Sequence, residues 1–166
     1  MEMGAELYTE TLVQSVTEQE SESILRTIRG ITRAKKVVFA TNAYTSALLP
    51  QYKGVITPYR GANSHLMADP EPPFLESTYN LRYGAHYDYM APQPDGGVIL
   101  GGATSVYRGG DGLPDKAPWW NYWDDSETVD GVKEYFENTM TSRMLEWRGK
   151  AVTMDRTWTG SKCFTA

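Results

Sequence analysis

The stretch of the sequence with the most side chains that could do chemistry is the tyrosine-rich segment Ser77–Met90. Successive side chains on a strand point to opposite faces, so a single strand here would separate two sets of residues. One face would carry Tyr83, Ala85, Tyr87 and Tyr89, and the other Arg82, Gly84, His86 and Asp88. The tyrosine hydroxyls could bind a polar ligand, and His86 could act as a general acid or base because imidazole titrates near neutral pH. The alternative interpretations are tyrosine rings that pack the sheet and a solvated polar face.

Four further positions are candidates for ligand binding or structure. Arg60 could anchor an anion because its planar guanidinium matches a carboxylate, although an arginine can equally stabilise a turn. Trp119 and Trp120 could cover a ligand pocket or form a dimer contact. His65 lies on an apolar strand and is expected to be structural. The two histidines and the lone Cys163 have no metal-ligand spacing, so no metal site is predicted.

Mostly short β-segments must position these residues. Alternating apolar runs separated by turn residues predict strands, and an unbroken apolar run predicts a strand buried on both faces. The expected hairpin strands are 11–17 and 24–29, the buried strand is Val37–Ala40, and later strands are expected at 55–57, 64–67, 77–90, 98–100 and 151–158. Pro94–Gly97 is a hairpin turn signal, and 43–49 is a short helix candidate before Pro50. Residues 105–125 are irregular, and 159–166 form a tail.

One longer helix is expected at about 126–146. Asp125 or Ser126 could cap it, and its apolar residues fall on one stripe, namely Val129, Val132, Phe136, Met140 and Met144. A mainly antiparallel or mixed sheet with one well-defined helix and short flanking helices predicts the α+β class. The chain of 166 residues is expected to form a single domain, 1–166.

Composition and charge argue against some classes of binding partner. The net charge of −5 and the lack of a long basic run argue against nucleic acid. No apolar segment reaches the length of a membrane span or a signal sequence, and one cysteine excludes an internal disulfide framework. We therefore expect no membrane partner and a cytoplasmic location.

Several motifs resemble a known family when they are taken together. Ala34–Asn42 ends in Ala-Thr-Asn, Pro58–Gly61 reads Pro-Tyr-Arg-Gly, and Tyr87–Gly102 combines an aromatic strand, a Pro, a turn and a Gly-Gly end. A Trp-Thr-Gly motif at Trp158–Gly160 precedes Phe164–Ala166. In this order they resemble the FAD-dependent oxidoreductases that include D-amino-acid oxidase, glycine oxidase and sarcosine oxidase. The resemblance implies that 1–50 is a remnant of the flavin-domain hairpin and late strand, and that 54–166 is substrate-domain-like.

The resemblance also implies roles for the candidate residues. Tyr89, three residues before Pro92, matches the position at which the family presents an aromatic hydroxyl to the substrate. With His86 it forms the predicted catalytic set. The predicted substrate-binding residues are Arg60, Tyr83, Tyr87, Trp119 and Trp120. The implied ligand is a small amine, amino acid or carboxylate.

The sequence departs from the family where FAD would bind. The family's Gly-x-Gly-x-x-Gly turn, whose backbone approaches the pyrophosphate, occurs nowhere in the sequence. Ala62 replaces a Gln, Cys163 replaces a Gly, and the family continues beyond the Phe-Thr motif at 164–165. We therefore expect no cofactor bound by this chain alone, and FAD only if a partner supplies the missing dinucleotide-binding unit.

Three functions follow as hypotheses. The first, slightly preferred because the chain starts at Met1, is a flavin-free enzyme of isomerase or cyclase type that uses acid–base chemistry on a small substrate. The second is a part of a complete FAD-dependent amine or amino-acid oxidoreductase that needs a partner for FAD. The third is a non-catalytic binding module. The first and third predict a homodimer, because the apolar segment Val37–Ala40 would otherwise be exposed.

Overall fold

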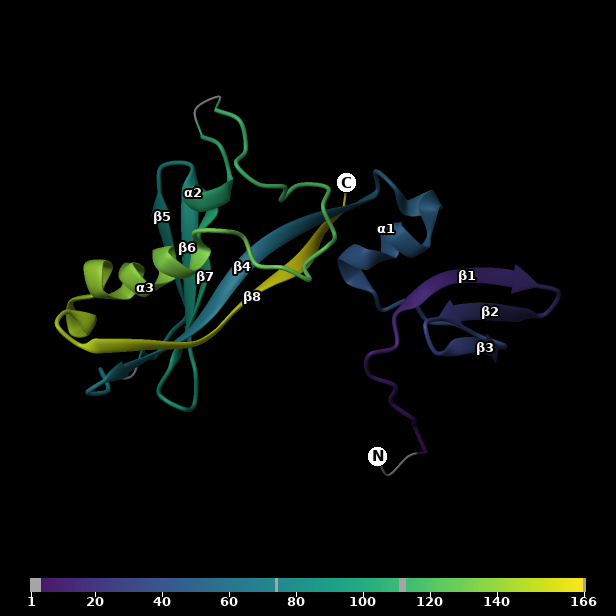
Figure 1. Ribbon diagram of the computed structural model, residues 1–166, viewed down its shortest axis with the longest axis horizontal. Coiled ribbons are helices and arrows are strands. Elements are labelled where there is room, and N and C mark those ends of the chain that lie inside the picture. The colour runs from purple at the N-terminus through teal and green to yellow at the C-terminus, as the bar shows by residue number, and fades with distance from the viewer. Residues whose placement is uncertain (1–3, 74, 111–112, 166) are drawn as a thin grey trace.

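The computed structural model describes residues 4–73, 75–110 and 113–165, and two antiparallel sheets dominate it (Figure 1). The first sheet has three strands in sequence order, β1 (Val13–Gln19), β2 (Glu22–Thr27) and β3 (Gly30–Ala34). The predicted hairpin is confirmed, with Gln19 paired to Glu22. Its turn is tighter than expected because Glu20, at φ 51°, reverses the chain within two residues.

The segment Val37–Ala40 is not a buried strand, so that prediction is wrong. It follows the end of β3 without regular structure, and Val38 is 89% exposed. A strand buried on both faces needs neighbours that supply hydrogen bonds along both edges. No strand in the described part of the chain pairs with this segment. Val38 and Ala40 are therefore exposed, and Val37 and Phe39 are only partly buried.

Short helical turns connect the two sheets. They are η1 (Asn42–Tyr44), α1 (Thr45–Leu48) and η2 (Pro50–Tyr52), where the sequence predicts a short helix stopped by Pro50. In Figure 1, α1 lies between the small sheet and the long strands β4 and β8.

The second sheet has five strands in the order β5-β6-β7-β4-β8. Its strands are β4 (Ile56–Asp69), β5 (Tyr79–Tyr83), β6 (His86–Pro92), β7 (Val98–Gly102) and β8 (Ala151–Thr165). The predicted hairpin turn at Pro94–Gly97 joins β6 to β7. The predicted tail after Trp158 is instead strand, since β8 pairs with β4 as far as Thr165 opposite Ile56.

The tyrosine-rich segment is two strands rather than one. Gly84 takes a positive φ of 60°, and the chain reverses there so that Tyr83 pairs with His86. Residues directly opposite each other in an antiparallel pair share a face. Tyr83 therefore lies on the face of His86 and Asp88, not on that of Tyr87 and Tyr89 as predicted.

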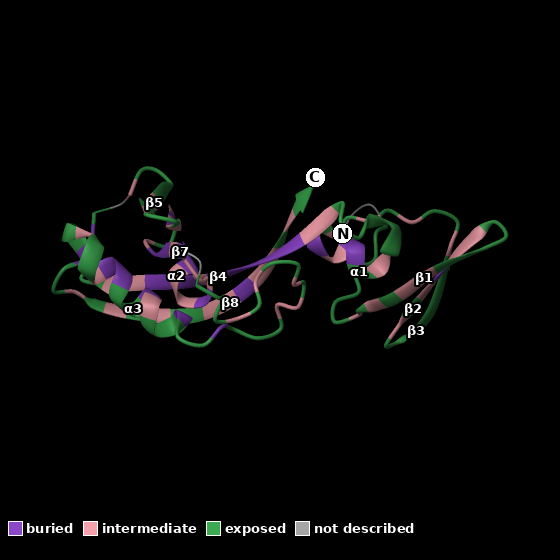
Figure 2. Cartoon of the chain, turned by 90° about the horizontal axis from the view of Figure 1, so that it is seen from above, coloured by how far each residue is buried: buried purple, intermediate pink, exposed green. Residues whose placement is uncertain are grey.

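The core lies where helix α3 (Val132–Arg143) packs on one face of the large sheet, which we call the helix face. Figure 2 shows this buried band along β4, β7 and α3. The predicted apolar stripe is confirmed, because Val132, Phe136 and Met140 are fully buried against Leu66, Met90 and Leu100. Burial of such side chains contributes roughly 1.5–3 kcal/mol each to folding.

Helix α3 is shorter than the predicted 126–146. It begins after Gly131, which has φ 80°, and it ends at Arg143 before the extended residue Met144 and the turn η3 (Leu145–Trp147). The residues before Gly131 instead form a loop that is hydrogen-bonded to the sheet. The carbonyl of Glu127 accepts hydrogen bonds from Thr159 and Arg60, which prevents a helix from starting at Ser126.

The two sheets and short helices confirm the α+β class. Besides α3, one turn of helix, α2 (Thr104–Tyr107), follows β7. Within the described ranges, no helix has the length and apolar character that crossing a bilayer requires.

Candidate functional site

The face of the large sheet opposite α3 carries most of the polar aromatic side chains, and we call it the tyrosine face. Register defines it, because Tyr89 aligns with Gly101, Gly101 with Asn63, and Asn63 with Trp158. The adjacent row on the same face pairs Tyr59 with Lys162. The members used below are Tyr59, Asn63, Tyr87, Tyr89, Trp158 and Lys162.

Hydrogen bonds link these side chains into a pair and a group of three. The hydroxyls of Tyr59 and Tyr87 are 3.0 Å apart. The hydroxyl of Tyr89 donates to the amide oxygen of Asn63, and Lys162 Nζ donates to the same hydroxyl at 3.4 Å. The ammonium group of Lys162 also lies 4.8 Å from the centre of the Tyr89 ring, which is within cation–π range. A positive charge and a phenol hydroxyl thus meet at one point of the face.

Glycines make room for this arrangement. A Cβ atom at Gly101 would lie 2.3 Å from the Tyr89 ring and 2.4 Å from Asn63 Oδ1, so only glycine allows the ring to lie flat there. Gly61 and Gly160 are paired across β4 and β8 on the same face. A Cβ at Gly160 would meet nothing within 4 Å. Gly61 is buried beside the Tyr59 ring, so the open space between the Tyr59–Lys162 row and the Asn63–Trp158 row lies over Gly160, and we call it the glycine floor.

An aromatic wall stands at one end of the face. Trp120 forms an isolated bridge to Tyr59, and the loop that contains it donates from Asn121 N to Pro58 O at 2.9 Å. The ring centres of Trp120 and Phe164 are 5.5 Å apart, and those of Tyr59 and Trp119 are 5.4 Å apart. Trp120 and Phe164 are about half exposed. They can therefore cover an apolar part of a ligand beside the glycine floor.

The buried tyrosines of this site act as hydrogen-bond donors rather than bases. Burial, with the neighbouring Tyr107 second, raises the pKa of Tyr59 far above its ordinary value. Burial raises the pKa of Tyr107 to about 12, and its hydroxyl donates to the Gly102 carbonyl at 3.1 Å. Both phenols remain protonated at neutral pH because desolvation disfavours the phenolate.

His86 and Tyr83 lie on the helix face, in a second polar cluster centred on Asp88. Asp88 is completely buried and accepts hydrogen bonds from Ala103 N–H at 2.8 Å and Tyr135 O–H at 2.6 Å. The hydroxyls of Tyr135 and Tyr83 are 2.9 Å apart, and His86 Nδ1 is 3.5 Å from Thr104 Oγ1. The sheet thus separates the two predicted catalytic residues, Tyr89 and His86.

Burial and the Asp88 carboxylate set the protonation of this cluster. Desolvation raises the pKa of Asp88 against the opposing effect of the Tyr135 hydrogen bond. Burial, followed by the bond to Asp88, raises the pKa of Tyr135 to about 12. Asp88 also belongs to β6, the strand that carries Tyr87 and Tyr89, so the cluster holds the tyrosine face in place from behind.

Arg60 does not line the tyrosine face. It follows Tyr59 on β4 and pairs with Ser161, so its side chain is on the helix face. His65 is on the tyrosine face but at the far end of β4, where its Nδ1 lies 2.8 Å from Asp155 Oδ1 and its Nε2 lies 3.4 Å from Asp95 Oδ2. Neither side chain meets Tyr89.

Of the sequence candidates, the structure brings together Tyr87 and Tyr89, with Trp119 and Trp120 at the aromatic wall. Sequence reasoning missed Asn63 and Lys162. Alternation along 59–63 could have indicated Asn63, since Tyr59 and Asn63 are four residues apart on one strand. Lys162 had no such signal, because its segment is expected to be a tail.

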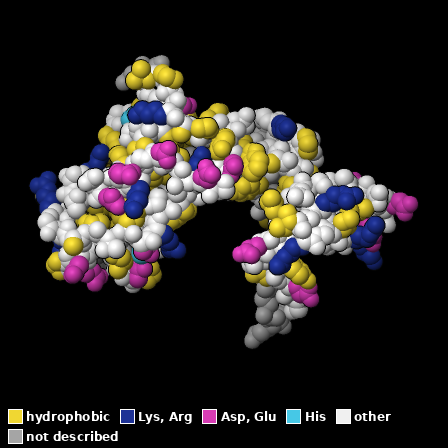
Figure 3. Space-filling model, in the orientation of Figure 1, with side chains coloured by type: hydrophobic (Ala, Val, Ile, Leu, Met, Phe, Trp, Pro, Cys, Tyr) yellow, Lys and Arg dark blue, Asp and Glu magenta, His cyan; other side chains and the backbone are white. Residues whose placement is uncertain are grey.

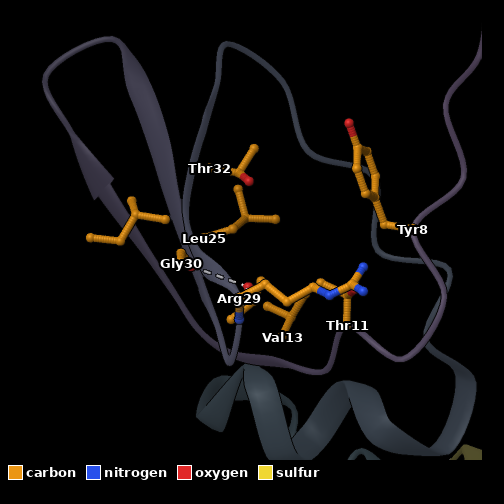
Figure 4. A pocket seen from close by; sticks show the side chains of 9 residues that line it. Tyr8, Thr11, Val13, Leu25, Arg29, Gly30 and Thr32 are labelled. Atoms are coloured by element: carbon orange, nitrogen blue, oxygen red, sulfur yellow. Dashed lines mark hydrogen bonds between the residues drawn. The ribbon is translucent and has the colours of Figure 1, made fainter.

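Other clefts lie away from this face. One of about 510 Å³ is on the small sheet, where Arg29 reaches along Thr11 and Tyr8 stands opposite (Figure 4). A more apolar one of about 560 Å³ is bordered by β1, α1 and Trp123. Across the described ranges, no three His, Cys, Asp or Glu side chains are grouped as metal ligands.

Comparison with known proteins identifies a matching family and solved structures with a similar fold. The family model described as FAD dependent oxidoreductase matches residues 1–165. Glycine oxidase from Geobacillus kaustophilus superposes with a TM-score of 0.61 and 21% identity, covering 98% of this chain and 38% of that enzyme. For glycine oxidase from Bacillus cereus the TM-score is 0.57 and the identity 17%, over 96% of this chain and 39% of that enzyme. No curated protein sequence matches.

The chain spans about two fifths of the length of these two oxidases. At such identities the superpositions establish the fold alone, whereas the family model covers nearly the whole sequence. The chain therefore belongs to the family of FAD-dependent oxidoreductases.

Proposed function

We propose that the chain is the substrate-recognition part of an FAD-dependent oxidoreductase, and that its tyrosine face binds the carboxylate of a small amino-acid-like substrate. The observation that carries this proposal is the convergence of Lys162 Nζ and Tyr89 O–H, 3.4 Å apart, beside Gly160, where an added Cβ would meet nothing within 4 Å. A charged donor beside a neutral one is a suitable receptor for a carboxylate.

Asn63 can adapt the site to the ligand. Its amide oxygen now accepts the Tyr89 proton. If the amide turns to present its NH₂ group, the Tyr89 oxygen becomes the acceptor and its proton becomes available to a bound carboxylate. Lys162 then supplies the charge, Tyr89 the second donor, and the aromatic wall excludes water from the rest of the substrate.

Three small probes test this assignment by isothermal titration of the chain. Acetate carries only the carboxylate, methylamine only the amine, and glycine both. We expect acetate and glycine to bind and to compete with each other, and methylamine not to compete. Competition by methylamine alone would contradict carboxylate recognition.

The residues present do not fit FAD by themselves. The sequence has no glycine-rich phosphate turn, and no Lys or Arg lines the apolar cleft between β1 and α1. The cleft with Arg29 opens on a hairpin rather than on a helix N-terminus. Neither cleft supplies a cradle for a pyrophosphate, so the groups that hold FAD would have to come from outside these 166 residues.

A second candidate function is acid–base chemistry of isomerase or cyclase type without flavin. Titration of the chain with FAD, followed by flavin fluorescence, separates the two. Both candidates predict no binding by the chain alone, but only the oxidoreductase part should form a yellow complex with a polypeptide that carries the dinucleotide-binding unit. Flavin bound by the chain alone would contradict the misfit.

We also propose that the chain forms a homodimer through its exposed apolar segment. Val38 is 89% exposed, and Leu12 and Ile31 are also exposed. The surface is hollowed between the bodies of the two sheets, with apolar side chains at its borders (Figure 3). Surfaces of this kind are covered in stable assemblies. Light scattering should give the mass of a dimer, and Val38→Asp should shift it to a monomer, whereas Val55→Asp should not. A monomer at every concentration would contradict the proposal.

A further inference from the structure

A separate cleft on the helix-face side of the large sheet contains an arginine whose hydrogen-bonding capacity is only partly used. Its volume is about 460 Å³, and its lining includes Arg60, Lys116, Tyr122, Glu127 and Asp130. The plane of the sheet separates it from the tyrosine face, because Arg60 and Tyr59 are successive residues of β4.

Arg60 is only 7% exposed, yet its Nε–H has no partner among the described residues. One end of its guanidinium donates to the Glu127 carbonyl, and the Tyr122 ring lies 5.3 Å from Cζ. A buried, charged donor without an acceptor is costly, and native structures nearly always satisfy such groups. Arg60 also lines the cleft, so the part of its guanidinium that faces the cleft can donate to a ligand there.

The wall of the cleft is already fixed in position. Thr159 Oγ1 donates to the carbonyls of Asp125 and Glu127, both at 2.8 Å, and Ser161 N donates to Asp125 Oδ2 at 3.1 Å. On the other side, Arg60 N donates to Trp119 O at 2.8 Å. These bonds fasten the loop to β4 and β8, so a ligand would not have to order it. Preorganised sites of this kind bind with a smaller entropic cost.

The charges around the cleft indicate the class of ligand. Arg60 and Lys116 are positive, and Glu127 and Asp130, both exposed, are negative. The nearby Asp124 carboxylate, whose pKa is lowered chiefly by hydrogen bonds to Ser126 and less by Arg60, adds a further negative charge. A multiply charged anion would be attracted by Arg60 and Lys116 but repelled by the carboxylates. A molecule with one carboxylate and one ammonium group complements both sets of charges.

We propose that this cleft is a second ligand site, which binds a small zwitterion such as a free amino acid. The carboxylate accepts from the Arg60 guanidinium and faces Lys116, and the ammonium group faces Glu127 and Asp130. Such a site would let the concentration of an amino acid be sensed on the face opposite Tyr89 and Lys162.

The test uses the full chain with Lys162→Gln, which removes the charge of the tyrosine face and leaves the cleft intact. Glycine, acetate, methylamine and inorganic phosphate are titrated separately, with the Arg60 Nε–H signal followed by NMR. Glycine should bind and shift that signal. We expect acetate and phosphate to bind at least about tenfold more weakly, because each lacks the ammonium group. Equal affinity for phosphate, or a signal that glycine does not move, would overturn the proposal.

Two variants locate the site. Arg60→Gln should abolish glycine binding, but it also removes the bond to Glu127 and could impair folding. Lys116→Gln, at the exposed rim, retains the fold and should weaken glycine binding several-fold. Lys133→Gln, on the exposed surface of α3, is the matched control and should have no effect. Unchanged glycine affinity in Lys116→Gln would assign the binding elsewhere. All arms carry Lys162→Gln, which weakens carboxylate binding on the tyrosine face, and a change caused by Lys116→Gln on this background therefore reports on the cleft.

Discussion

Replacing Lys162 by Gln should weaken acetate binding to the chain by about tenfold. The substitution keeps a polar, unbranched side chain that is one atom shorter, and it removes the charge that lies 3.4 Å from the Tyr89 hydroxyl. A hydrogen bond to a charged group contributes about 1.5–3 kcal/mol, and because Lys162 is exposed we take the lower end, which corresponds to about a tenfold change in affinity. Isothermal titration with acetate measures the effect directly.

Tyr89→Phe should give a smaller loss, several-fold, since it removes a neutral donor and retains the ring that packs over Gly101. Lys133→Gln is the control, because Lys133 makes only a surface ion pair with Glu137 at 3.9 Å. Its acetate affinity should equal that of the unmodified chain. An equal loss of acetate affinity in Lys133→Gln and Lys162→Gln would show that the effect comes from the net charge of the chain and not from a specific contact.

Replacing Asp88 by Ala should lower the free energy of unfolding by about 2–4 kcal/mol. The change leaves the buried Ala103 N–H and the half-buried Tyr135 O–H without the carboxylate that accepts from both. Each unsatisfied buried group costs about 1–3 kcal/mol. Urea denaturation measures the difference, and Asp130→Ala, at an exposed position, should change stability little. A loss no larger than in Asp130→Ala would show that the cluster does not hold the strands.

The pH dependence of the same carboxyl has a definite sign. Burial raises the pKa of Asp88 in the folded chain above its value in the unfolded chain. The folded state therefore binds the proton more tightly, so this contribution to stability is complete below the unfolded pKa and is lost as pH rises through the folded pKa. Asp88→Asn should remove that decline from the stability profile. A variant profile that keeps the same decline would assign it to another group.

Local signals predicted much of the fold. Pro94–Gly97 combines turn residues between two strand patterns, and the structure has the β6–β7 turn there. The stripe from Val132 to Met140 repeats with helical spacing, and its burial is confirmed. The ends of α3 were less predictable, since Ser126 can cap a helix in principle but the Glu127 carbonyl bonds to Thr159 and Arg60 instead.

The features of the fold that could not be predicted depend on which strands pair with each other. The turn at Gly84 has no strong turn neighbour, so the sequence predicts a single strand for the tyrosine segment and assigns Tyr83 to the wrong face. Val37–Ala40 has the composition of a central strand, but a strand requires partners as well as composition. Local sequence does not specify such partners.

Some residues of the candidate site could also be predicted from local sequence, and others could not. Tyr87 and Tyr89 could be assigned to one face from alternation alone. Lys162 and Asn63 join them only through the register of β4 with β8 and β7, which links residues 38 positions apart (Asn63 and Gly101) to 103 positions apart (Tyr59 and Lys162). Arg60 was found by residue type, but its face followed only from that register.

The most direct test of the central claim is an NMR titration of the ¹⁵N-labelled chain with acetate. Carboxylate recognition by Tyr89 and Lys162 predicts that the shifted amide signals cluster at Gly61, Tyr89, Gly160 and Lys162, and that Lys162→Gln suppresses those shifts. Signals that stay unmoved at these four positions, or that move equally in the variant, would contradict the account.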